Sequence, residues 1–404
     1  MSLDLSLLGR QVRQMSETLA RQADPDTARA ADVMNHCVAQ AGNEAHWRQA
    51  LELSRESTNW LLAYPIEPLD MVKAAPLRPD TYVVIATDGS QIDVDRHGML
   101  ACYLINTGRV YLRYGEQAAA RLSSQPNLYY EEHDLYLSDG ARRVAIEGSY
   151  VHARRDVEEL LAVVALADEW LNDRQDGPVL ALQDGTLIRW TLASAEKFLQ
   201  KHFVGRYLEG LDSLRERSIP VVSYTSRPRV TEMMGMIRLL YCPDVDVAAG
   251  RGARCAECSD IQAGRPPSCQ ICHGLVDADV LGQRLQEGER GPLFASMNRM
   301  NLDMYGTHRI HFFYLRVGRE LARVELPLWL AEDPQQVDLI HQLVYDQCVK
   351  GHGYPVALAR AHEQAVVRSG DRRTFQRMVQ GSLLRADLPA VSSSKQEQKE
   401  YSRT

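Results

Sequence analysis

The stretch Tyr82-Val83-Val84-Ile85-Ala86-Thr87-Asp88-Gly89-Ser90 indicates how this chain folds. It begins with apolar, partly β-branched residues, which is typical of a buried strand, and we expect the strand to end at Asp88-Gly89. A second stretch, Leu182-Gln183-Asp184-Gly185-Thr186-Leu187, repeats the pattern at the end of the apolar residues 179–182. Helical patterns alternate with these strands, so the sequence predicts an α/β sheet flanked by helices.

The remaining elements are predicted from periodicity and from glycine and proline positions. Residues 99–106 and 110–114 look like two short strands separated by Gly108. Further strands are expected over 219–224, 311–317 and 320–326, and helices over 152–172, 193–217, 337–349, 355–367 and 371–384. This alternation supports one mixed sheet with helices packed against it.

The N-terminal region, residues 3 to about 63, is predicted to be helical. Apolar residues recur there at spacings of four, three and four, which places them on one helix face: Leu8, Val12, Met15 and Leu19. The sequence Asp24-Pro25-Asp26 is expected to end the first helix and start the next, because Asp caps helices and Pro fits a first turn. We therefore expect a helical arm before the sheet.

Composition indicates a globular protein outside the membrane. Among 404 residues, 45% are hydrophobic and 25% are charged. The longest apolar run, Leu160 to Ala167, is far shorter than the roughly 20 residues that cross a bilayer, and Met1-Ser2-Leu3-Asp4-Leu5 does not resemble a signal peptide. We expect a cytoplasmic protein without a membrane partner.

Charge alone argues against a nucleic-acid partner, because 53 Asp and Glu exceed 46 Lys and Arg and the net charge is −7. Arginines nevertheless cluster locally, around residues 142–155, 251–265 and 368–377. Such clusters are usually solvated surfaces, but they also suit a path for phosphates that leads to an acidic metal centre.

Four of the eight cysteines form two closely spaced pairs, Cys255-Ala-Glu-Cys258 and Cys269-Gln-Ile-Cys272. Two Cys-x-x-Cys pairs can supply four thiolates in a tetrahedron, which is the geometry of structural zinc. An iron–sulfur cluster and a pair of disulfides are the alternatives. The sequence predicts a zinc-binding insertion, which could contact DNA, contact a partner or brace a long loop.

The two Asp-Gly motifs are candidates for chemistry because ligands bind at the carboxyl ends of strands in an α/β sheet. Carboxylates that converge there can hold hard divalent cations, and two such ions can activate water and stabilise a leaving oxygen. Asp-Gly is also an ordinary turn signal. Asp88 and Asp184 are therefore candidate metal ligands or turn residues.

Further motifs resemble the NurA nuclease family. They occur in family order: Asp88-Gly89-Ser90, an arginine-rich helix with glutamates, Asp184-Gly185-Thr186-Leu187, Arg323-Val324-Glu325-Leu326-Pro327, and Gly353-Tyr354-Pro355 followed by Leu358, Ala361-His362 and Ala365. The resemblance spans about Tyr82 to Arg377 and omits the cysteines.

The resemblance implies an RNase H-like fold with a manganese-dependent DNA nuclease, for which Mg²⁺ is also possible. Such proteins act as 5′ to 3′ exonucleases and single-strand endonucleases, form homodimers, and work with the hexameric HerA ATPase in DNA end processing, repair or defence. By resemblance, the metal ligands are Asp88, Asp184, His362 and one helix glutamate, with Tyr354 lining the site. A lone histidine on a helix is otherwise more often structural.

Helical geometry selects between the two glutamates of Arg154-Arg155-Asp156-Val157-Glu158-Glu159. At roughly 100° per residue, Glu159 lies beside Val163 and Trp170 at the border of the apolar face, whereas Glu158 points further towards solvent. We predict Glu159 as the ligand and keep Glu158 as the alternative.

Candidate DNA contacts are arginines. The family often has a lysine after the strand equivalent to 221–224, and here Arg227 is the nearest cation, with a guanidinium in place of the ammonium. Arg372 and Arg373 follow the segment that carries His362 and complete the predicted DNA-binding set.

These elements predict the following organisation: a helical region over 1–75, a nuclease core over 76–242 and 292–390, a four-cysteine insertion over 243–291, and a disordered tail over 391–404. Two alternatives to the DNA nuclease remain. One is a catalytically silent RNase H-like scaffold that binds DNA or the ATPase ring, and the other is a phosphodiester enzyme on the same fold that acts on RNA or RNA–DNA hybrids.

Overall fold

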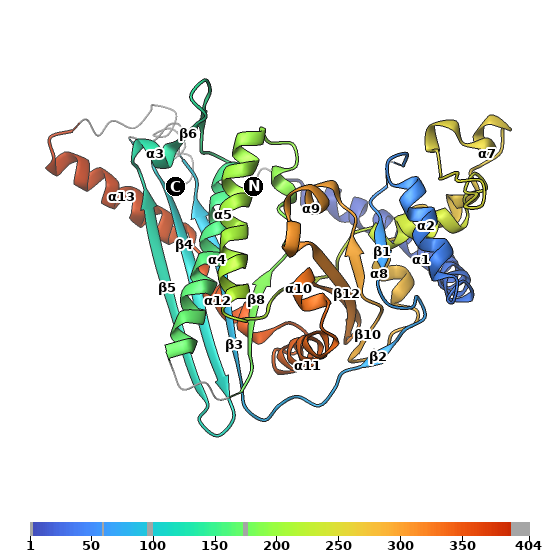
Figure 1. Ribbon diagram of the computed structural model, residues 1–404. Coiled ribbons are helices and arrows are strands. Elements are labelled where there is room, and N and C mark those ends of the chain that lie inside the picture. Colours follow the sequence, from blue (N-terminus) through green and yellow to red (C-terminus); the bar gives the residue numbers. More distant parts are fainter. Residues whose placement is uncertain (1–2, 59, 95–99, 173–176, 389–404) are drawn as a thin grey trace. The chain divides into compact units, whose positions relative to one another are not determined.

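The computed structural model describes residues 3–58, 60–94, 100–172 and 177–388 (Figure 1). The chain forms two compact units. The first unit comprises residues 1–75 and 225–325, and the second unit comprises residues 76–224 and 326–404. The predicted tail, 391–404, lies outside the described residues, and the predicted domain boundaries stay predictions.

The second unit contains a mixed sheet with the strand order β9-β8-β3-β4-β5. β3 pairs in parallel with β8 and antiparallel with β4, and β8 pairs in parallel with β9. The strands are β3 (Tyr82–Ile92), β4 (Tyr103–Tyr114), β5 (Ala119–Tyr129), β8 (Val179–Asp184) and β9 (Val221–Ser226). The expected α/β sheet flanked by helices is thus present.

Helices cover both faces of this sheet. α4 (Ser149–Asn172) packs on β3 and on α5 (Lys197–Glu216), while α12 (Val356–Ala365) packs on β3 and β4. Side chains of β3 alternate between these helices: Thr87 donates its hydroxyl to the Glu159 carbonyl of α4, and Ser90 donates its hydroxyl to the Ala365 carbonyl of α12. α4 and α12 therefore lie on opposite faces.

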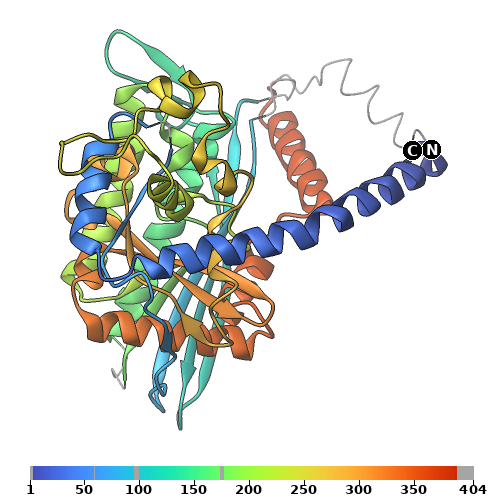
Figure 2. The same ribbon diagram turned by 90° about the vertical axis from the view of Figure 1, so that its right-hand side faces the viewer.

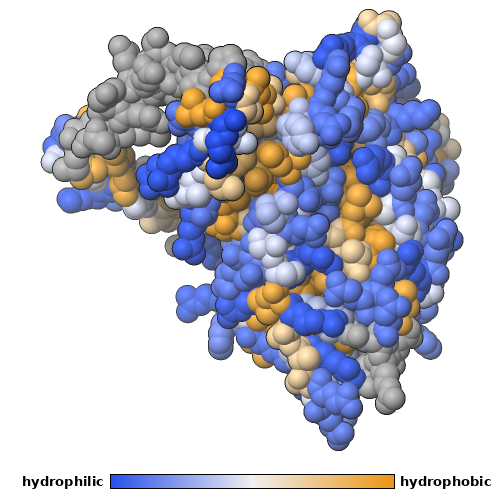
Figure 3. All heavy atoms as spheres, turned by 90° about the vertical axis from the view of Figure 1, so that its left-hand side faces the viewer, coloured by the Kyte–Doolittle hydropathy of each residue, from blue (hydrophilic) through white to orange (hydrophobic). Residues whose placement is uncertain are grey.

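The rest of the second unit flanks this core. It consists of α3 (Glu132–Leu135), the hairpin β6 (Tyr136–Ser138) and β7 (Arg143–Ala145), the turn η1 (Trp190–Leu192), α10 (Leu328–Ala331), α11 (Pro334–Lys350) and α13 (Ser369–Arg385). β5 is the last strand in the order, and most of its residues are exposed. On the face shown in Figure 3, hydrophilic side chains prevail and hydrophobic ones form separate patches.

The strands of the first unit follow the order β1-β11-β12-β13, and β10 joins β2 to β12. Its strands are β1 (Ala63–Pro65), β2 (Lys73–Ala74), β10 (Glu289–Arg290), β11 (Phe294–Ser296), β12 (Ile310–Val317) and β13 (Glu320–Pro327). Its helices and turns are α1 (Leu5–Ala39), α2 (Glu44–Ser54), α6 (Glu232–Leu240), η2 (Cys255–Glu257), α7 (Ser259–Gln262), η3 (Ser268–Cys272), α8 (Asp277–Leu281), α9 (Arg299–Met304) and η4 (Gly306–His308).

A buried ion-pair network occupies the core of the first unit. Arg323 pairs with Glu232 at 2.6 Å and with Glu325 at 2.8 Å, and all three side chains are almost fully buried. Two residues of the Arg323-Val324-Glu325 motif are thus members of this network. Because a buried charge without a partner is destabilising, loss of one member of the network would destabilise the fold by leaving another charge unpaired.

The sequence predicted that the first helix ends at Asp24-Pro25-Asp26, and this prediction is wrong. α1 is continuous from Leu5 to Ala39 and contains Pro25, and Figure 2 shows it as one long helix (blue). Its second half buries Ala30, Val33 and Met34 in the hydrophobic core of the first unit. This packing fixes the helix beyond the proline and offsets the roughly 3 kcal/mol that an internal proline costs.

Two glycines that were expected to mark strand ends lie inside strands instead. β3 continues through Asp88-Gly89 to Ile92, and β4 runs through Gly108. A Cβ at Gly108 would collide with the Ala361 carbonyl of α12 and lie 2.6 Å from the Ala365 nitrogen. Gly108 is needed because a helix backbone crosses the strand there, and the local turn signal does not reveal such a contact.

No helix within the described ranges is long and apolar enough to cross a lipid bilayer.

The Gly108 contact gives a stability prediction. Gly108→Ala should lower the free energy of unfolding by about 1–3 kcal/mol, because the added methyl group must displace α12. Thermal unfolding monitored by circular dichroism measures the effect. Gly205→Ala is the matched control, since Gly205 lies inside α5 with no atom near its added Cβ, and it should leave the unfolding temperature unchanged or raise it. Equal unfolding temperatures for Gly108→Ala and wild type would contradict the packing argument.

Candidate active site

Four carboxylates line one cavity of about 290 Å³ in the second unit, and three of them, Asp88, Glu159 and Asp184, come from three separate elements. Asp88 comes from the middle of β3, Glu159 from α4 and Asp184 from the end of β8. The other lining residues are His152, Arg155, Asp156, Gly185, Thr186, Ile188, Arg189, Trp190 and Thr191. The structure thus brings together the three predicted acidic ligands.

Asp184 lies where the sequence placed it, at the carboxyl end of a strand. The chain turns there through Gly185, whose φ of 83° suits glycine, and the Gly185 N–H donates to the Tyr224 carbonyl. The Tyr354 hydroxyl donates to Asp184 Oδ1 at 2.9 Å. Burial raises the pKa of the Asp184 carboxyl above its usual value, and the Tyr354 hydrogen bond opposes this shift.

Asp88 is paired with the predicted histidine ligand. His362 Nδ1 lies 2.7 Å from Asp88 Oδ2, and the Gly89 N–H donates to Asp88 Oδ1 at 2.8 Å. The pairing follows from the strand register: Asp88 is opposite Gly108, and α12, which carries His362, crosses at Gly108. His362 is 69% exposed, so a ligand can reach its ring.

Glu159 approaches the other two carboxylates from the opposite face of β3. A Cβ at Gly89 would collide with the Glu159 carboxylate and lie 2.7 Å from Arg155 Cγ, so Gly89 leaves the space that Glu159 needs. Burial, followed by the charge of Asp156, raises the pKa of Glu159 to about 8, although Arg155 at 3.0 Å opposes the shift. Glu159 is held close to the other acids at an electrostatic cost.

Glu158, the alternative ligand, lies elsewhere. It pairs with Arg154 at 3.2 Å and does not line the cavity. The geometry therefore favours Glu159, in agreement with the helix-face argument, and the ligand assignment itself stays a prediction.

The sequence analysis assigned no role to Asp156 and Arg189, which also line the cavity and pair with each other at 3.0 Å. Asp156 precedes Glu159 by three residues, so helical periodicity could have placed it on the same face. Arg189 stacks over Tyr207 with its guanidinium 4.5 Å from the ring centroid. No sequence signal indicated this arginine, because its place depends on the fold of the segment after β8.

The donor set fits a hard divalent cation. Carboxylate oxygens and an imidazole suit Mn²⁺ or Mg²⁺. Burial first, and nearby carboxylates after it, raise the pKa values of Glu159 and Asp184, and a bound cation would oppose both effects. In the described part of the chain, however, no three His, Cys, Asp or Glu side chains are already placed as a ligand cluster. The acids surround the cavity, and metal binding requires their side chains to close on the ion.

The four predicted zinc ligands, Cys255, Cys258, Cys269 and Cys272, are free thiols in the first unit, in and directly after η2 and in η3. Asp260 closes the loop between the two pairs: it accepts hydrogen bonds from the Ser268 N–H at 2.9 Å and the Ser268 hydroxyl at 2.7 Å, and pairs with Arg265. These contacts tie Ser268, which precedes the second pair, to α7, which follows the first pair. The zinc assignment stays a prediction.

The arginines predicted to contact DNA do not line the carboxylate cavity. Arg227 belongs to the first unit and pairs with Glu320 at 2.6 Å. Arg372 on α13 donates to the Gln91 carbonyl at 2.9 Å, which attaches α13 to β3, and Arg373 is exposed on the same helix.

Comparisons with known proteins agree with the motif order. The family model described as NurA domain matches residues 82–367. This match covers more than half of the chain, so the chain belongs to the NurA domain family, a family of nucleases. A comparison with curated proteins found no match.

Solved structures with similar folds include NurA and RNase H proteins. The match to a crystal structure of NurA covers 76% of this chain and 90% of the NurA chain, with 10% sequence identity and a TM-score of 0.39. A crystal structure of NurA bound to dAMP and manganese covers 74% and 88% at 13% identity, with a TM-score of 0.34. LC9-RNase H1, a type 1 RNase H with the type 2 active-site motif, covers 37% and 64% at 12% identity, with a TM-score of 0.21.

The two neighbouring glutamates provide a matched test of the site. Glu159→Gln should weaken Mn²⁺ binding at least roughly 10–100-fold, because it removes a negative charge from the cavity. Loss of a residue that only hydrogen-bonds to a metal ligand already costs about this much affinity. Glu158→Gln, which changes the same group one residue away, should bind Mn²⁺ as wild type does. Titration followed by electron paramagnetic resonance measures free Mn²⁺, and equal affinities for the two variants would refute the assignment of Glu159.

Proposed function

We propose that this protein is a manganese-dependent DNA nuclease, with the 5′ to 3′ exonuclease and single-strand endonuclease activities that its resemblance to NurA implies. One observation carries the proposal: in a chain of the NurA family, Asp88, Glu159 and Asp184 line a single cavity although they come from three elements. Convergence of this kind is what phosphodiester hydrolysis requires of acidic ligands.

In this proposal Asp88, Glu159, Asp184 and His362 hold the metal. Manganese, when bound, supplies positive charge against the phosphate and activates water. The protein contributes orientation. Tyr354 fixes one oxygen of Asp184, and Asp88 holds Nδ1 of His362, so the other ring nitrogen is left for a ligand.

Cationic side chains keep the acids in place before a metal arrives. Arg155 pairs with Glu159, and Arg189 pairs with Asp156. Tyr354 stays protonated as a donor, since burial and the charge of Asp184 raise its pKa well above the usual value. Its ring also stands edge-on to Tyr224, with centroids 5.5 Å apart. The site is therefore largely organised by residues of the second unit alone.

Cleavage assays test the proposal. Asp88→Asn and Asp184→Asn should each reduce Mn²⁺-dependent cleavage of labelled linear DNA by at least about 10³-fold, because each removes a charged oxygen ligand. Asp93→Asn, an acid just beyond β3 that bonds to Gln91 outside the cavity, should cleave at the wild-type rate. Full activity in Asp88→Asn or Asp184→Asn would exclude the proposed site. Wild-type protein that binds DNA without cutting it would support the silent scaffold instead, and cleavage of RNA alone would change the substrate class.

The partners follow from the family resemblance: DNA, a HerA-type hexameric ATPase and a second copy of this chain. For the dimer, α1 offers an exposed apolar stripe at alternating spacings of three and four: Leu5, Leu8, Val12, Met15 and Leu19. This spacing is that of a coiled-coil seam, and the flanking positions 9, 11, 16 and 18 carry no charge that would repel an identical helix. We propose that a second copy covers this stripe.

We further propose that the four-cysteine loop binds structural Zn²⁺. Purified protein should contain about one zinc per chain by elemental analysis, and Asp260→Asn should release zinc to a chelator faster than wild type, because it removes the charge that holds Ser268 and Arg265. Asp246→Asn, which loses an exposed ion pair with Arg251 in the same unit, is the control. Zinc-free, fully folded wild type would overturn this assignment.

A further inference from the structure

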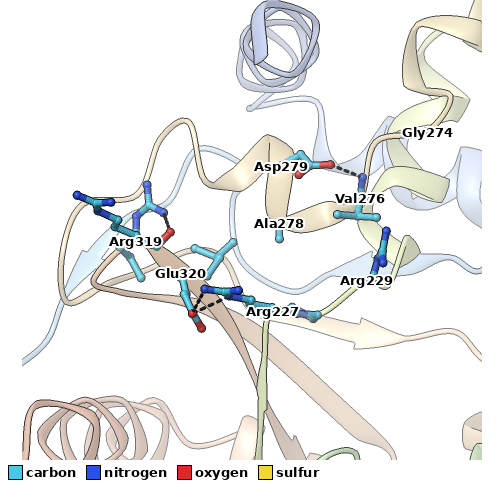
Figure 4. A pocket seen from close by; sticks show the side chains of 11 residues that line it. Arg227, Arg229, Gly274, Val276, Ala278, Asp279, Arg319 and Glu320 are labelled. Carbon is cyan, nitrogen blue, oxygen red and sulfur yellow. Dashed lines mark hydrogen bonds and ion pairs between the residues drawn. The ribbon is translucent and has the colours of Figure 1, made fainter. Parts of the chain in front are cut away.

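A second cavity, of about 540 Å³, lies in the first unit and is rich in arginine. Four arginines line it, against two carboxylates: Arg227, Arg229, Arg316 and Arg319, with Asp279 and Glu320. Figure 4 shows these side chains around the hollow, with Arg227 crossing to Glu320 and Arg229 on the side nearer to Val276. The cavity has an excess of positive charge within a chain of net charge −7.

Little of this charge is neutralised. Arg227 pairs with Glu320 yet is 79% exposed. Asp279 is engaged by the N–H of Val276, at 2.9 Å, in a helix cap. Arg229 and Arg319 are exposed, and their guanidinium groups make no hydrogen bond or ion pair to any residue in the described ranges. Such unpaired guanidinium groups around a hollow favour a ligand with several anionic oxygens.

Arg316 gives the cavity a fixed cation. Its guanidinium donates to the carbonyls of Leu285, Gly282 and Arg319, at 3.2, 2.9 and 3.3 Å. These neutral acceptors hold the group in position without cancelling its charge. A bound anion would meet a cation that has already lost its rotamer freedom, which lowers the entropic cost of binding.

The backbone of Arg227 is also unusual. Its φ is 47°, in the left-handed region that non-glycine residues rarely adopt, and Pro228 follows it. Arg227 pairs with Glu320 in this conformation, and Arg227, Pro228 and Arg229 all line the cavity. Strained backbone of this kind concentrates at ligand sites.

We propose that this cavity binds the phosphodiester backbone of a nucleic-acid strand, and this inference rests on the proposed nuclease function. The arginines match phosphate oxygens bidentately. No aromatic side chain lines the cavity, so it offers no platform for base stacking and holds the strand through its backbone, irrespective of sequence. A local cationic site also explains how an acidic chain retains a polyanion.

The test removes the two unpaired arginines. The double variant Arg229→Ala, Arg319→Ala should bind fluorescently labelled single-stranded DNA about tenfold more weakly in buffer without chelator and without added Mn²⁺ or Mg²⁺, where no added metal supports cleavage. The slope of log affinity against log salt should fall by about 1–2, because roughly 0.7 of that slope is lost per phosphate contact on a single strand. The control is Arg55→Ala, Arg299→Ala, which removes two arginines of the same unit that pair with Glu52 and Glu56 outside the cavity and should leave DNA binding unchanged.

The outcomes separate the inference from the function on which it rests. Unchanged affinity and salt slope in the folded Arg229, Arg319 variant, with wild-type DNA cleavage in Mn²⁺, would overturn the cavity assignment alone. Wild type that neither binds nor cleaves DNA would overturn both. Inorganic phosphate is titrated in parallel: displacement of DNA at micromolar phosphate would identify a small-anion site and contradict strand binding, whereas displacement that needs tens of millimolar supports it.

Discussion

The candidate active site depends on one steric constraint, the close approach of helix α12 to strand β4 at Gly108. Because no side chain separates them, the α12 backbone lies directly on the strand, and Ala361 and Ala365 are buried there. Asp88 is opposite Gly108 in the register, so the same contact delivers His362 to Asp88. Gly89 has the corresponding role on the other face, where it admits Glu159. Two missing side chains thus allow ligands from both faces of a sheet to meet.

Electrostatic repulsion opposes this arrangement. Burial disfavours the charged form of the carboxylates around this small cavity, and their repulsion of one another adds to the cost, which is why the pKa values of Glu159 and Asp184 rise. Arg155 and Arg189 offset part of that repulsion. The first unit has the reverse situation, where four arginines and only two carboxylates line a hollow. Each site has an unbalanced charge that a ligand of opposite sign would neutralise.

The sequence predicted much of this arrangement. Asp184 could be placed because a strand end is a local feature, and Glu159 could be chosen over Glu158 because helical periodicity is regular. Gly89 and Gly108 were misread as turn residues, because what requires a glycine there is contact with a helix distant in sequence. Pro25 was misread for a similar reason: packing of the second half of α1 overrides the local helix-breaking signal. The cysteine spacing predicts a metal site, but the distance in space between the two pairs cannot be predicted from their spacing in the sequence.

β5 raises a question of solubility. It is the last strand in the order of the second unit and has eleven residues. Most of these residues are exposed, including Leu122 and Leu128. An edge of this length is a template on which another chain can add a strand and start aggregation. Pro126 interrupts it, because proline has no N–H to offer, and Arg121 places a charge on it. This exposed edge of the second unit therefore carries its own protection against uncontrolled self-association.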